Sequence, residues 1–545
     1  MPVQKRMHKA GLRWDRFVGR RPLLTLLLLL FTLFGCVASL QSGLTVDDAT
    51  EQKTFRVITG AAKSLLLGHL DEYNSLQSYH DRYYGIGFDL LAYPFQILLT
   101  PFLVNKLGVD SETALLLARR TVVFLLFATS VVVFYRCARF FIQQRSIASA
   151  ASAAYAACPY LFGHAMINLR DSPFMSVYLI CTYLSLKLVR RHLLGNTGSY
   201  RADLVRLALV TAGLVSIRIP GLMILVQYAF TFALADYCNR DLSKARLWRW
   251  QNIAWFCTVL VAVVVILFPA VWLNPLGEIF AGMNYVGWFY QPGCTLTWGE
   301  CMKPYASVAY LSGWLVVKLP IVILAGIAFV PFALKKIWQD PFHRIAYLTL
   351  LFGSVYVLIV IIPLRARLYD ETRQLLFIYP LLFLVAFIAI YFASQRLALV
   401  AALLALGMFL WDQLRLYPYQ YVYFNEFGRF LDIDRLFETD YWGISAREHA
   451  RLLQADSRLM TGLNCLYADP IELYRPFIDP NTCVQPLDAL TAYPARNGVV
   501  IAVTCSPNRF QAPKTCWEIA PVTRKLPLSS RVITMSAAYY CSPVQ

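Results

Sequence analysis

The 545-residue sequence has few charged residues, because Asp, Glu, Lys and Arg together make up only 15% of it. Soluble domains are about one quarter charged, so a set of ordinary soluble domains is excluded. The 58% hydrophobic content excludes a disordered chain, and 27 glycines with 27 prolines are too few for a collagen-like or low-complexity protein. The class that remains is a polytopic, mainly α-helical membrane protein.

Several signatures of catalysis and ligand binding are also absent. The sequence has no P-loop, nucleophile elbow, zincin helix or dinucleotide glycine fingerprint. ATP-driven transport, serine hydrolysis and nicotinamide chemistry are therefore disfavoured. Carboxylates can hold a divalent metal, but no C-x-x-C or H-E-x-x-H spacing supports one, and we predict that no cofactor is required.

Apolar stretches long enough to cross a bilayer recur along the chain. Basic residues cluster between them, which explains the net charge of +18 as orientation charge rather than nucleic-acid binding. The basic segment 1–21 predicts a cytoplasmic amino terminus. We predict eleven spans, at about 22–40, 113–135, 146–166, 172–189, 203–217, 219–236, 252–273, 307–333, 344–363, 375–393 and 396–415.

The apolar stretch 86–105 decides the orientation of everything after it. It contains Asp89, Pro94 and Pro101, and if it crossed the membrane every later basic cluster would lie outside. We therefore predict that it lies on the outer membrane face, within a first outer loop at 41–112.

The predicted membrane domain covers 22–416, and the more polar segment 417–545 follows it outside the membrane. An alternating run at 498–503 and a helical pattern near 444–454 predict a small α/β unit there. Seven cysteines are predicted outside, where disulfides form. Cys294 and Cys301 share one short loop and could pair, and the odd number leaves at least one cysteine unpaired.

Ionisable groups collect on the predicted outer face. Charged side chains close to lipid are costly, so their presence there indicates a functional site. Asp47 and Asp48 follow the first span. Repulsion between two adjacent carboxylates raises the pKa of one of them. The alternative is that both simply favour the start of a helix over 49–67, where acidic residues suit the helix dipole. Asp171 follows Arg170, and a simple ion pair is the alternative there. His80, Asp81, Arg82 and Tyr83 open stretch 86–105 and could equally form an interfacial belt.

Arginines on the same face break the positive-inside pattern. Arg218 lies between two spans, and Arg365, Arg367 and Arg373 surround Asp370 and Glu371 in a later loop. The planar guanidinium suits phosphate. A carboxylate can deprotonate an attacking hydroxyl while arginines stabilise a departing phosphate, so the combination favours transfer from a phosphate-linked donor.

Ordered motifs then carry a family resemblance over most of residues 20–445. They are Val46–Glu51 with its Asp-Asp pair, Asp81-Arg82-Tyr83-Tyr84, Asp171-Ser172-Pro173, Tyr369–Pro380, Tyr417–Asn425 and Glu438–Gly443. In these motifs the sequence resembles GT-C glycosyltransferases, in the bacterial branch related to protein O-mannosyltransferases and the lipid A aminoarabinose transferase. It departs from them in having Asp-Asp for Asp-Glu and Arg82 for Lys.

The resemblance implies a GT-C fold and an inverting transferase at the outer face of the bacterial inner membrane. Its donor would be a polyprenyl-phosphate sugar, and its acceptor a hydroxyl of a glycolipid, polysaccharide or protein. Asp47 would be the general base, with Asp48 and Asp171 tuning it or positioning the acceptor. Phosphate ligands would come from Arg373, which we prefer, and from Arg82, Arg218, Arg365 and Arg367; His80, Asp81, Tyr83 and Glu371 would shape the site.

Two other functions fit the same outer-face residues. A transporter or flippase of an anionic lipid also needs many spans and arginines, but such proteins usually show internal repeats and interruptions at the midplane. A non-catalytic assembly protein with a transferase-like fold is the third possibility. The acidic residues at one surface favour the enzyme.

Overall fold

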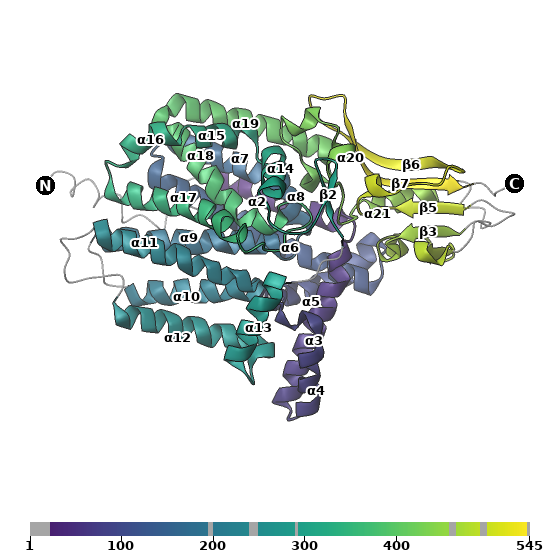
Figure 1. The fold of residues 1–545 in the computed structure, drawn as a ribbon, viewed down its shortest axis with the longest axis horizontal. Helices are drawn as coiled ribbons and strands as arrows, with labels where there is room; N and C mark the ends of the chain where they lie inside the picture. The colour runs from purple at the N-terminus through teal and green to yellow at the C-terminus, as the bar shows by residue number, and fades with distance from the viewer. Residues whose placement is uncertain are drawn as a thin grey trace.

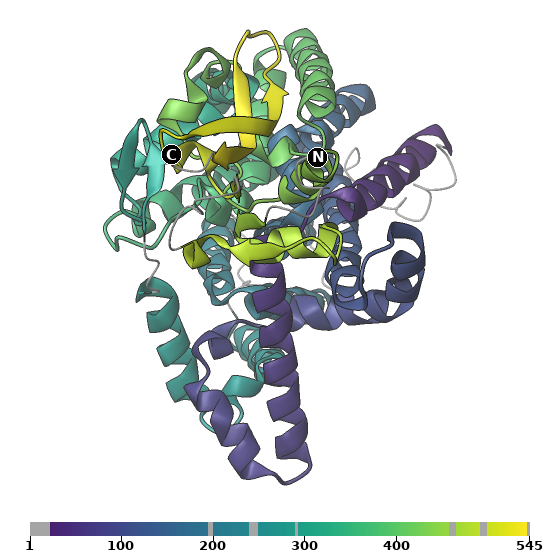
Figure 2. The ribbon, with the colours of Figure 1, turned by 90° about the vertical axis from the view of Figure 1, so that its right-hand side faces the viewer.

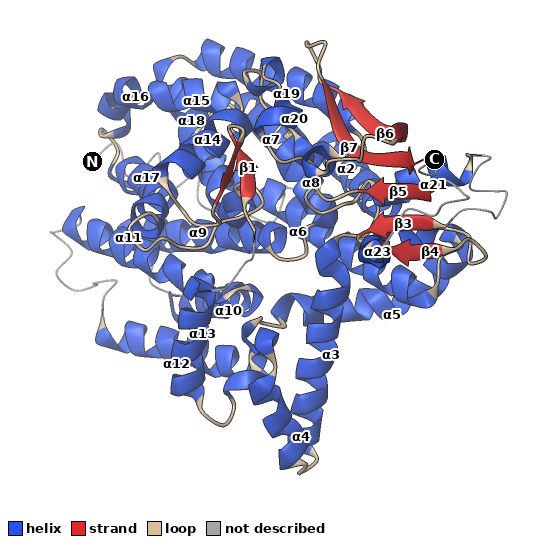
Figure 3. Ribbon diagram, turned by 45° about the vertical axis from the view of Figure 1, so that its right-hand side comes forward, coloured by secondary structure: helices blue, strands red, loops and turns tan. Residues whose placement is uncertain are grey.

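The computed structural model describes residues 22–194, 200–238, 249–288, 293–456, 465–490 and 499–541. The basic segment 1–21, which carries the prediction of a cytoplasmic amino terminus, lies outside the described residues. A bundle of long helices fills most of the molecule, and a small sheet packs at one end of it (Figures 1 and 3). The predicted class, a mainly α membrane protein with a carboxyl-terminal α/β unit, is confirmed. We call the end of the bundle that carries the sheet the sheet end.

Long helices run side by side along the longest axis of the molecule, as α9 to α12 and α17 do in Figure 1. The long helices of the bundle are α2 (Pro22–Gln41), α6 (Ser111–Phe141), α9 (Asp171–Leu193), α10 (Tyr200–Ile217), α11 (Ile224–Cys238), α12 (Trp250–Leu267), α17 (Pro341–Ile361), α18 (Tyr379–Ala393) and α19 (Gln395–Leu416). Within the described ranges, nine helical segments are long and apolar enough to cross a membrane, or ten if one bent pair forms a single span.

Two of the predicted spans are not single helices. Stretch 146–166 is divided into α7 (Arg145–Ala157) and α8 (Pro159–Ile167). Stretch 307–333 is divided into α14 (Val308–Lys318), α15 (Ile321–Ala328) and α16 (Val330–Ile337), with a 109° bend between the first two. The sequence analysis gave each stretch as one span and did not predict these breaks. Each main break falls at a proline, which lacks the backbone N–H that a helix interior needs.

The predicted first outer loop contains α3 (Val46–Leu66), α4 (Leu70–Asn74), η2 (Ser75–Ser78), η3 (His80–Tyr83) and α5 (Gly87–Leu107). Figure 1 shows α3 and α4 running across the direction of the long helices.

Helix α5 is long and apolar enough to span a membrane, but both of its ends lie at the sheet end. A Cβ on Gly87 would meet Ser216 at the end of α10, and Leu107 lines a cavity with Gln41 and Tyr417 at the ends of α2 and α19. It therefore lies across the bundle instead of through it, as Figure 2 also shows, which agrees with the predicted surface position of 86–105.

The sheet has five strands in the order β4-β3-β5-β7-β6. Strand β3 (Leu466–Asp469) is parallel to β4 (Val484–Pro486) and β5 (Val499–Val503), whereas β7 (Val532–Cys541) is antiparallel to β5 and to β6 (Cys516–Lys525). The predicted strand and helix are thus β5 and α21 (Ala446–Gln454). A separate hairpin joins β1 (Thr295–Thr297) to β2 (Glu300–Met302). Shorter elements at the ends of the long helices include η4 (Ile219–Met223), η5 (Pro269–Val271), α13 (Pro275–Trp288) and η6 (Arg373–Ile378).

Three disulfides occur among the cysteines predicted to lie outside. Cys294 pairs with Cys301 in the β1–β2 hairpin, as predicted. The other two bonds, Cys465–Cys483 and Cys516–Cys541, lie in the carboxyl-terminal unit, and Cys505 stays free. The odd cysteine expected from the sequence is therefore Cys505.

Candidate active site

The two adjacent carboxylates at the start of α3 have different surroundings. The backbone N–H of Thr45 donates to Asp48 Oδ2 at 2.7 Å, which forms one half of a capping box at the helix start. Arg120 donates to the same oxygen at 2.5 Å, and the Asp48 side chain is only 1% exposed. The helix-start interpretation therefore describes Asp48, which holds α3 against α6.

Asp47, by contrast, faces open space. Its side chain is 43% exposed. Trp442 Nε1 donates to Asp47 Oδ2 at 3.0 Å, whereas Oδ1 accepts no hydrogen bond from the described part of the chain. One carboxylate oxygen is held and the other is available, which is the arrangement a general base requires.

Arg373, at the start of η6, lies among three carboxylates. Its Nη1 atom is 3.6 Å from Asp47 Oδ2 and 3.5 Å from Asp171 Oδ2, and its Nη2 atom is 3.0 Å from Asp370 Oδ2. The guanidinium also lies 4.9 Å from the ring centres of Tyr369 and Trp442. Aromatic faces stabilise a cation and restrict its orientation, so Arg373 is held at the centre of the cluster.

Asp171 brings a second arginine into this cluster. It begins α9, is 2% exposed, and pairs with Arg218, which lies between α10 and η4. Asn168 Nδ2 donates to Asp171 Oδ2 at 3.1 Å, and the Asp171 backbone N–H donates to Asn168 Oδ1 at 2.7 Å. Asp171 thus bridges Arg218 and Arg373, and its side chain is too enclosed to meet an acceptor freely.

A buried ionic network underlies Asp47 and ties four helices together. Arg170 lies 3.3 Å from Glu51 of α3 and 3.2 Å from Asp89 of α5, and Arg119 of α6 lies 3.3 Å from Asp89. Burial raises the pKa of Glu51 to about 7, against the lowering effect of Arg170. Breaking a buried pair leaves an uncompensated charge, so this network fixes the first turns of α3 and hence Asp47.

The loop before Arg373 has an unusual backbone. Asp370 and Glu371 both have positive φ, at 52° and 67°, a region that is costly for residues other than glycine and that clusters at functional sites. Burial raises the pKa of Asp370 to about 7, although Arg373 acts in the opposite direction.

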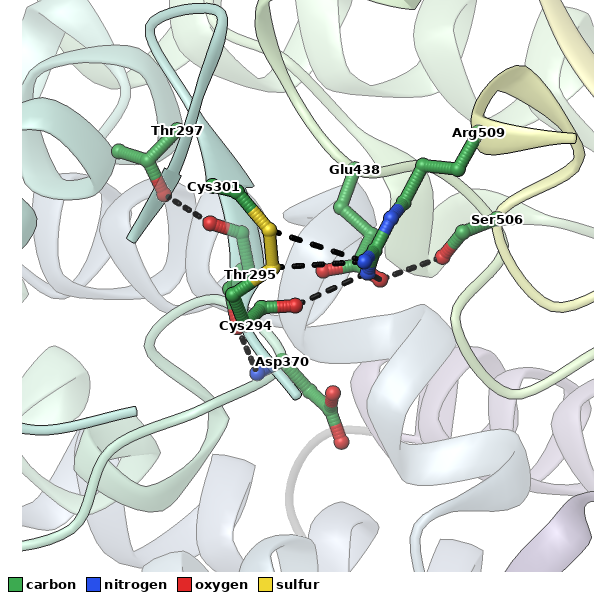
Figure 4. The surroundings of a disulfide bond; sticks show 8 residues. All are labelled: Cys294, Thr295, Thr297, Cys301, Asp370, Glu438, Ser506 and Arg509. Carbon is green, nitrogen blue, oxygen red and sulfur yellow. Dashed lines mark hydrogen bonds and ion pairs between the residues drawn. A yellow bond between two sulfur atoms is a disulfide. The ribbon is translucent and has the colours of Figure 1, made fainter. Parts of the chain in front are cut away.

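The disulfide-bonded hairpin holds this loop from above (Figure 4). The Asp370 backbone N–H donates to Thr295 Oγ1 at 3.3 Å. Arg509 donates to the Cys294 carbonyl at 2.9 Å and pairs with Glu438 at 3.4 Å, so the hairpin is also tied to the carboxyl-terminal unit. The position of Asp370 therefore depends on contacts from three separate parts of the chain.

Several predicted site residues lie outside this cluster. Arg82 lies 3.4 Å from Glu278 of α13 and donates to the Tyr83 hydroxyl at 2.6 Å. His80 contacts the Tyr285 hydroxyl at 2.7 Å, and that hydroxyl donates to Asp81 at 3.2 Å. These residues form their own group beside α13.

The other predicted arginines and Glu371 are also elsewhere. Arg365 is exposed and lies 5.9 Å from the ring centre of Tyr305, and Arg367 makes no ion pair within the described ranges. Glu371 is buried in a pair with Lys318 at 2.7 Å. Of the predicted phosphate ligands, the structure brings only Arg218 and Arg373 together with Asp47 and Asp171.

Three aromatic residues of the cluster had no predicted role. Trp442 and Tyr369 contact Arg373, and both lie in motifs that carried the family resemblance. Burial raises the pKa of Tyr84, and Tyr369, Arg218 and Asp47 are among the groups that act on it. The Tyr84 ring lies 5.7 Å from the Arg170 guanidinium, whereas the Tyr83 ring lies 4.3 Å from that of Arg82.

Within the described residues, no group of three or more His, Cys, Asp or Glu side chains is placed to hold a metal ion.

Comparisons with known proteins give a likeness in structure but not in sequence. No protein-family model and no curated protein matches the chain. Among solved structures, the chain is similar to ArnT from Cupriavidus metallidurans bound to undecaprenyl phosphate, with 14% sequence identity and a TM-score of 0.46 over 94% of this chain and 98% of that one. A structural similarity at this low identity and TM-score assigns no role to any residue of this chain.

Proposed function

We propose that the protein is a membrane glycosyltransferase that moves a sugar from a polyprenyl-phosphate donor to an acceptor hydroxyl. The observation that carries this proposal is the exposed carboxylate of Asp47 beside Arg373, with Arg218 joined to the same cluster through Asp171. Asp47, Asp171, Arg218 and Arg373 come from four distant parts of the sequence. A base next to cations suits a reaction in which a proton leaves one partner and a phosphate leaves the other.

The proposed reaction is a single displacement. Asp47 Oδ1 accepts the proton of the acceptor hydroxyl, and the hydroxyl oxygen forms a bond to the anomeric carbon. The bond from that carbon to the phosphate oxygen breaks on the opposite face, and both of its electrons leave with polyprenyl phosphate. The configuration at the anomeric carbon is therefore inverted.

Arg373 and Arg218 are the proposed phosphate ligands. In this structure both contact carboxylates, with Arg373 at 3.5 Å and 3.6 Å from two of them, distances that are long for charged hydrogen bonds. A donor phosphate can take over Nη1 of Arg373 without breaking a short bond, whereas it shares Nη2 with Asp370 at 3.0 Å and competes with Asp171 for Arg218. The released charge then develops beside cations that are already in position.

The supporting test is a donor-consumption assay. Purified protein in nanodiscs is mixed with a panel of polyprenyl-phosphate sugars and a membrane extract as the acceptor. We expect release of polyprenyl phosphate with one sugar and transfer of that sugar with inverted configuration. Lipid that binds across a broad panel without any release would contradict the proposal and favour a transporter or a non-catalytic assembly protein.

A further inference from the structure

A polar cavity of about 500 Å³ lies at the sheet end, between the ends of α2, α5 and α19 and the carboxyl-terminal unit. It is distinct from the Asp47 cluster and has no role in the proposed reaction. Three arginines and one carboxylate are among its lining residues, which are Gln41, Gly43, Leu107, Tyr417, Pro418, Tyr419, Ile444, Arg447, Glu448, Arg451 and Arg524.

The single carboxylate of this cavity is already engaged. Arg524 Nη2 lies 2.6 Å from Glu448 Oε2, and the Tyr419 hydroxyl donates to the same oxygen at 2.7 Å. Glu448 therefore compensates the charge of Arg524, and the other two arginines face the cavity without a carboxylate partner in the described part of the chain.

Arg447 is the more buried of these two arginines, at 5% exposed. Its Nη1 atom donates to the carbonyls of Leu40 and Ser42 at 3.0 Å and 3.2 Å, while its buried Nε atom has no acceptor among the described residues. Burial and the positive charges of Arg451 and Arg120 lower the pKa of Arg447 to about 10. A buried cation without a counter-charge is costly unless an anion completes the site.

The helices below this cavity present apolar side chains outward. Within two turns of the ends of α2 and α19, the following residues are between 45% and 83% exposed: Phe34, Val37, Leu410, Trp411 and Leu414. The Tyr417 hydroxyl donates to Gln41 at 2.9 Å across the two helix ends, and the Tyr417 ring lies 6.4 Å from that of Phe34. Lipid covers such a surface in a membrane, so the arginines lie at the height of the head groups.

We propose that this cavity binds the phosphate group of an anionic lipid whose acyl chains lie along α2 and α19. Arg447 and Arg451 supply the donors, and Arg524 and Tyr419 form the far wall with Glu448. On the predicted orientation, the lipid belongs to the outer leaflet. Paired arginines at a membrane surface attract a lipid with a net negative head group more strongly than one whose phosphate is balanced by its own cation.

This lipid site is separated from the Asp47 cluster by one chain segment. A Cβ on Gly43 would lie 2.1 Å from the Ile444 carbonyl oxygen, so the chain before α3 is packed directly against the chain after Trp442. Asp47 and Trp442 lie just beyond this contact. The lipid would therefore brace the two segments that hold the general base, and its binding does not depend on the transferase function.

The test is a lipid-binding titration by native mass spectrometry without any sugar donor. Delipidated protein is titrated with phosphatidylglycerol, with phosphatidylcholine, and with inorganic phosphate. We expect phosphatidylglycerol to bind at least about tenfold more tightly than phosphatidylcholine. Arg451→Gln should raise the Kd for phosphatidylglycerol about tenfold, as expected for the loss of one charged contact. The matched control is Arg435→Gln, because Arg435 is exposed on the same carboxyl-terminal unit but lies outside the cavity.

Arg451 is exposed, so its replacement is expected to leave the fold intact; Arg447→Gln is the second variant, with size-exclusion elution as its check. Equal binding of the two lipids, or unchanged affinity in Arg451→Gln, would overturn the proposal. Tight binding of inorganic phosphate with no preference between the lipids would overturn it too, since the cavity would then hold a soluble anion.

Discussion

At the scale of single residues, Asp47 and Asp48 show how neighbours in the sequence take opposite roles. Asp48 points into the protein, where a capping box and Arg120 use its oxygens, and Asp47 points outward with one oxygen unoccupied. The difference follows from the helix, which turns successive side chains by about 100°. The sequence could not separate the two, because either aspartate suits the first turn of a helix.

Arg373→Ala is expected to weaken donor binding. It removes charged hydrogen bonds to the phosphate and leaves Asp171 and Asp370 with less positive charge beside them, so Kd for the donor should rise roughly 10- to 100-fold. Lipid-overlay or fluorescence titration with a non-transferable donor analogue measures it. Arg365→Ala is the matched control, because Arg365 is exposed and away from the cluster. Equal donor affinity in both variants would count against Arg373 as a phosphate ligand.

Asp370 is expected to make donor binding depend on pH. Burial raises its pKa to about 7, against the lowering effect of Arg373. Below that pH the Asp370 carboxyl group is neutral, so Arg373 can pair fully with the donor phosphate. Above that pH the Asp370 carboxylate competes with the phosphate for Arg373. Donor affinity should therefore fall as the pH rises from about 6 to about 8, either side of that pKa, and Asp370→Asn should remove this dependence. The donor is a phosphodiester and does not titrate in this range. A pH dependence that persists in Asp370→Asn would exclude Asp370 as its source.

At the scale of elements, the β1–β2 hairpin links the carboxyl-terminal unit to the Asp370 loop (Figure 4). Its contacts reach Asp370 through Thr295 and Glu438 through Arg509. These are backbone and side-chain contacts between segments far apart in the sequence, so no local pattern could predict them.

Removing the hairpin disulfide with Cys294→Ser/Cys301→Ser is expected to loosen this loop. Without the bond, the unfolded chain gains entropy worth about 2–3 kcal/mol for a loop of this length, so the unfolding temperature should fall. Donor affinity should fall with it because Asp370 and Arg373 lose their support. Cys465→Ser/Cys483→Ser is the control, since that bond lies in the sheet. It should lower stability without changing donor affinity. Loss of affinity in the control alone would contradict this account of the hairpin.

The sequence predicted the elements of the bundle well and their breaks poorly. Hydropathy located the spans, and charge placed 86–105 on the surface, because both depend on the side chains of one segment. The breaks at Pro159 and Pro320 were missed because the apolar run continues through both prolines. For the site, acidic and basic residues stood out by charge, but nothing in the sequence indicated which of them face one another.

Buried arginines in α6 were a missed signal. Arg119 and Arg120 lie inside the predicted span 113–135, where an ionisable residue needs a partner. Both pair with carboxylates of the first outer loop, Asp89 and Asp48. Their position inside a predicted span indicates that each needs a partner, and the structure identifies those partners.

At the scale of the whole molecule, the described helices make eleven passages between the two ends of the bundle if α7 with α8, and α14 to α16, are each counted as one passage. The passages are α2, α6, α7 with α8, α9, α10, α11, α12, α14 to α16, α17, α18 and α19. Helix α5 adds none because both of its ends lie at the sheet end.

This topology predicts the outcome of reporter fusions. A phosphatase that is active only outside the cytoplasm should be active after Gln545, and inactive within the basic segment 239–248, which lies outside the described residues. The physical reason is that Lys and Arg in short loops stay on the cytoplasmic side. Activity at 239–248 and none after Gln545 would invert the orientation and place the Asp47 cluster in the cytoplasm.

The central claim is that Asp47 acts as the base, and Asp47→Asn tests it most directly. Once a donor is known, its turnover and its affinity are measured for wild type, Asp47→Asn and the control Asp71→Asn, an exposed residue of the same outer loop. The account predicts that Asp47→Asn lowers kcat by at least about 100-fold, because the amide cannot accept the proton, while donor Kd changes little and the control keeps wild-type values. Full turnover in Asp47→Asn would contradict the account.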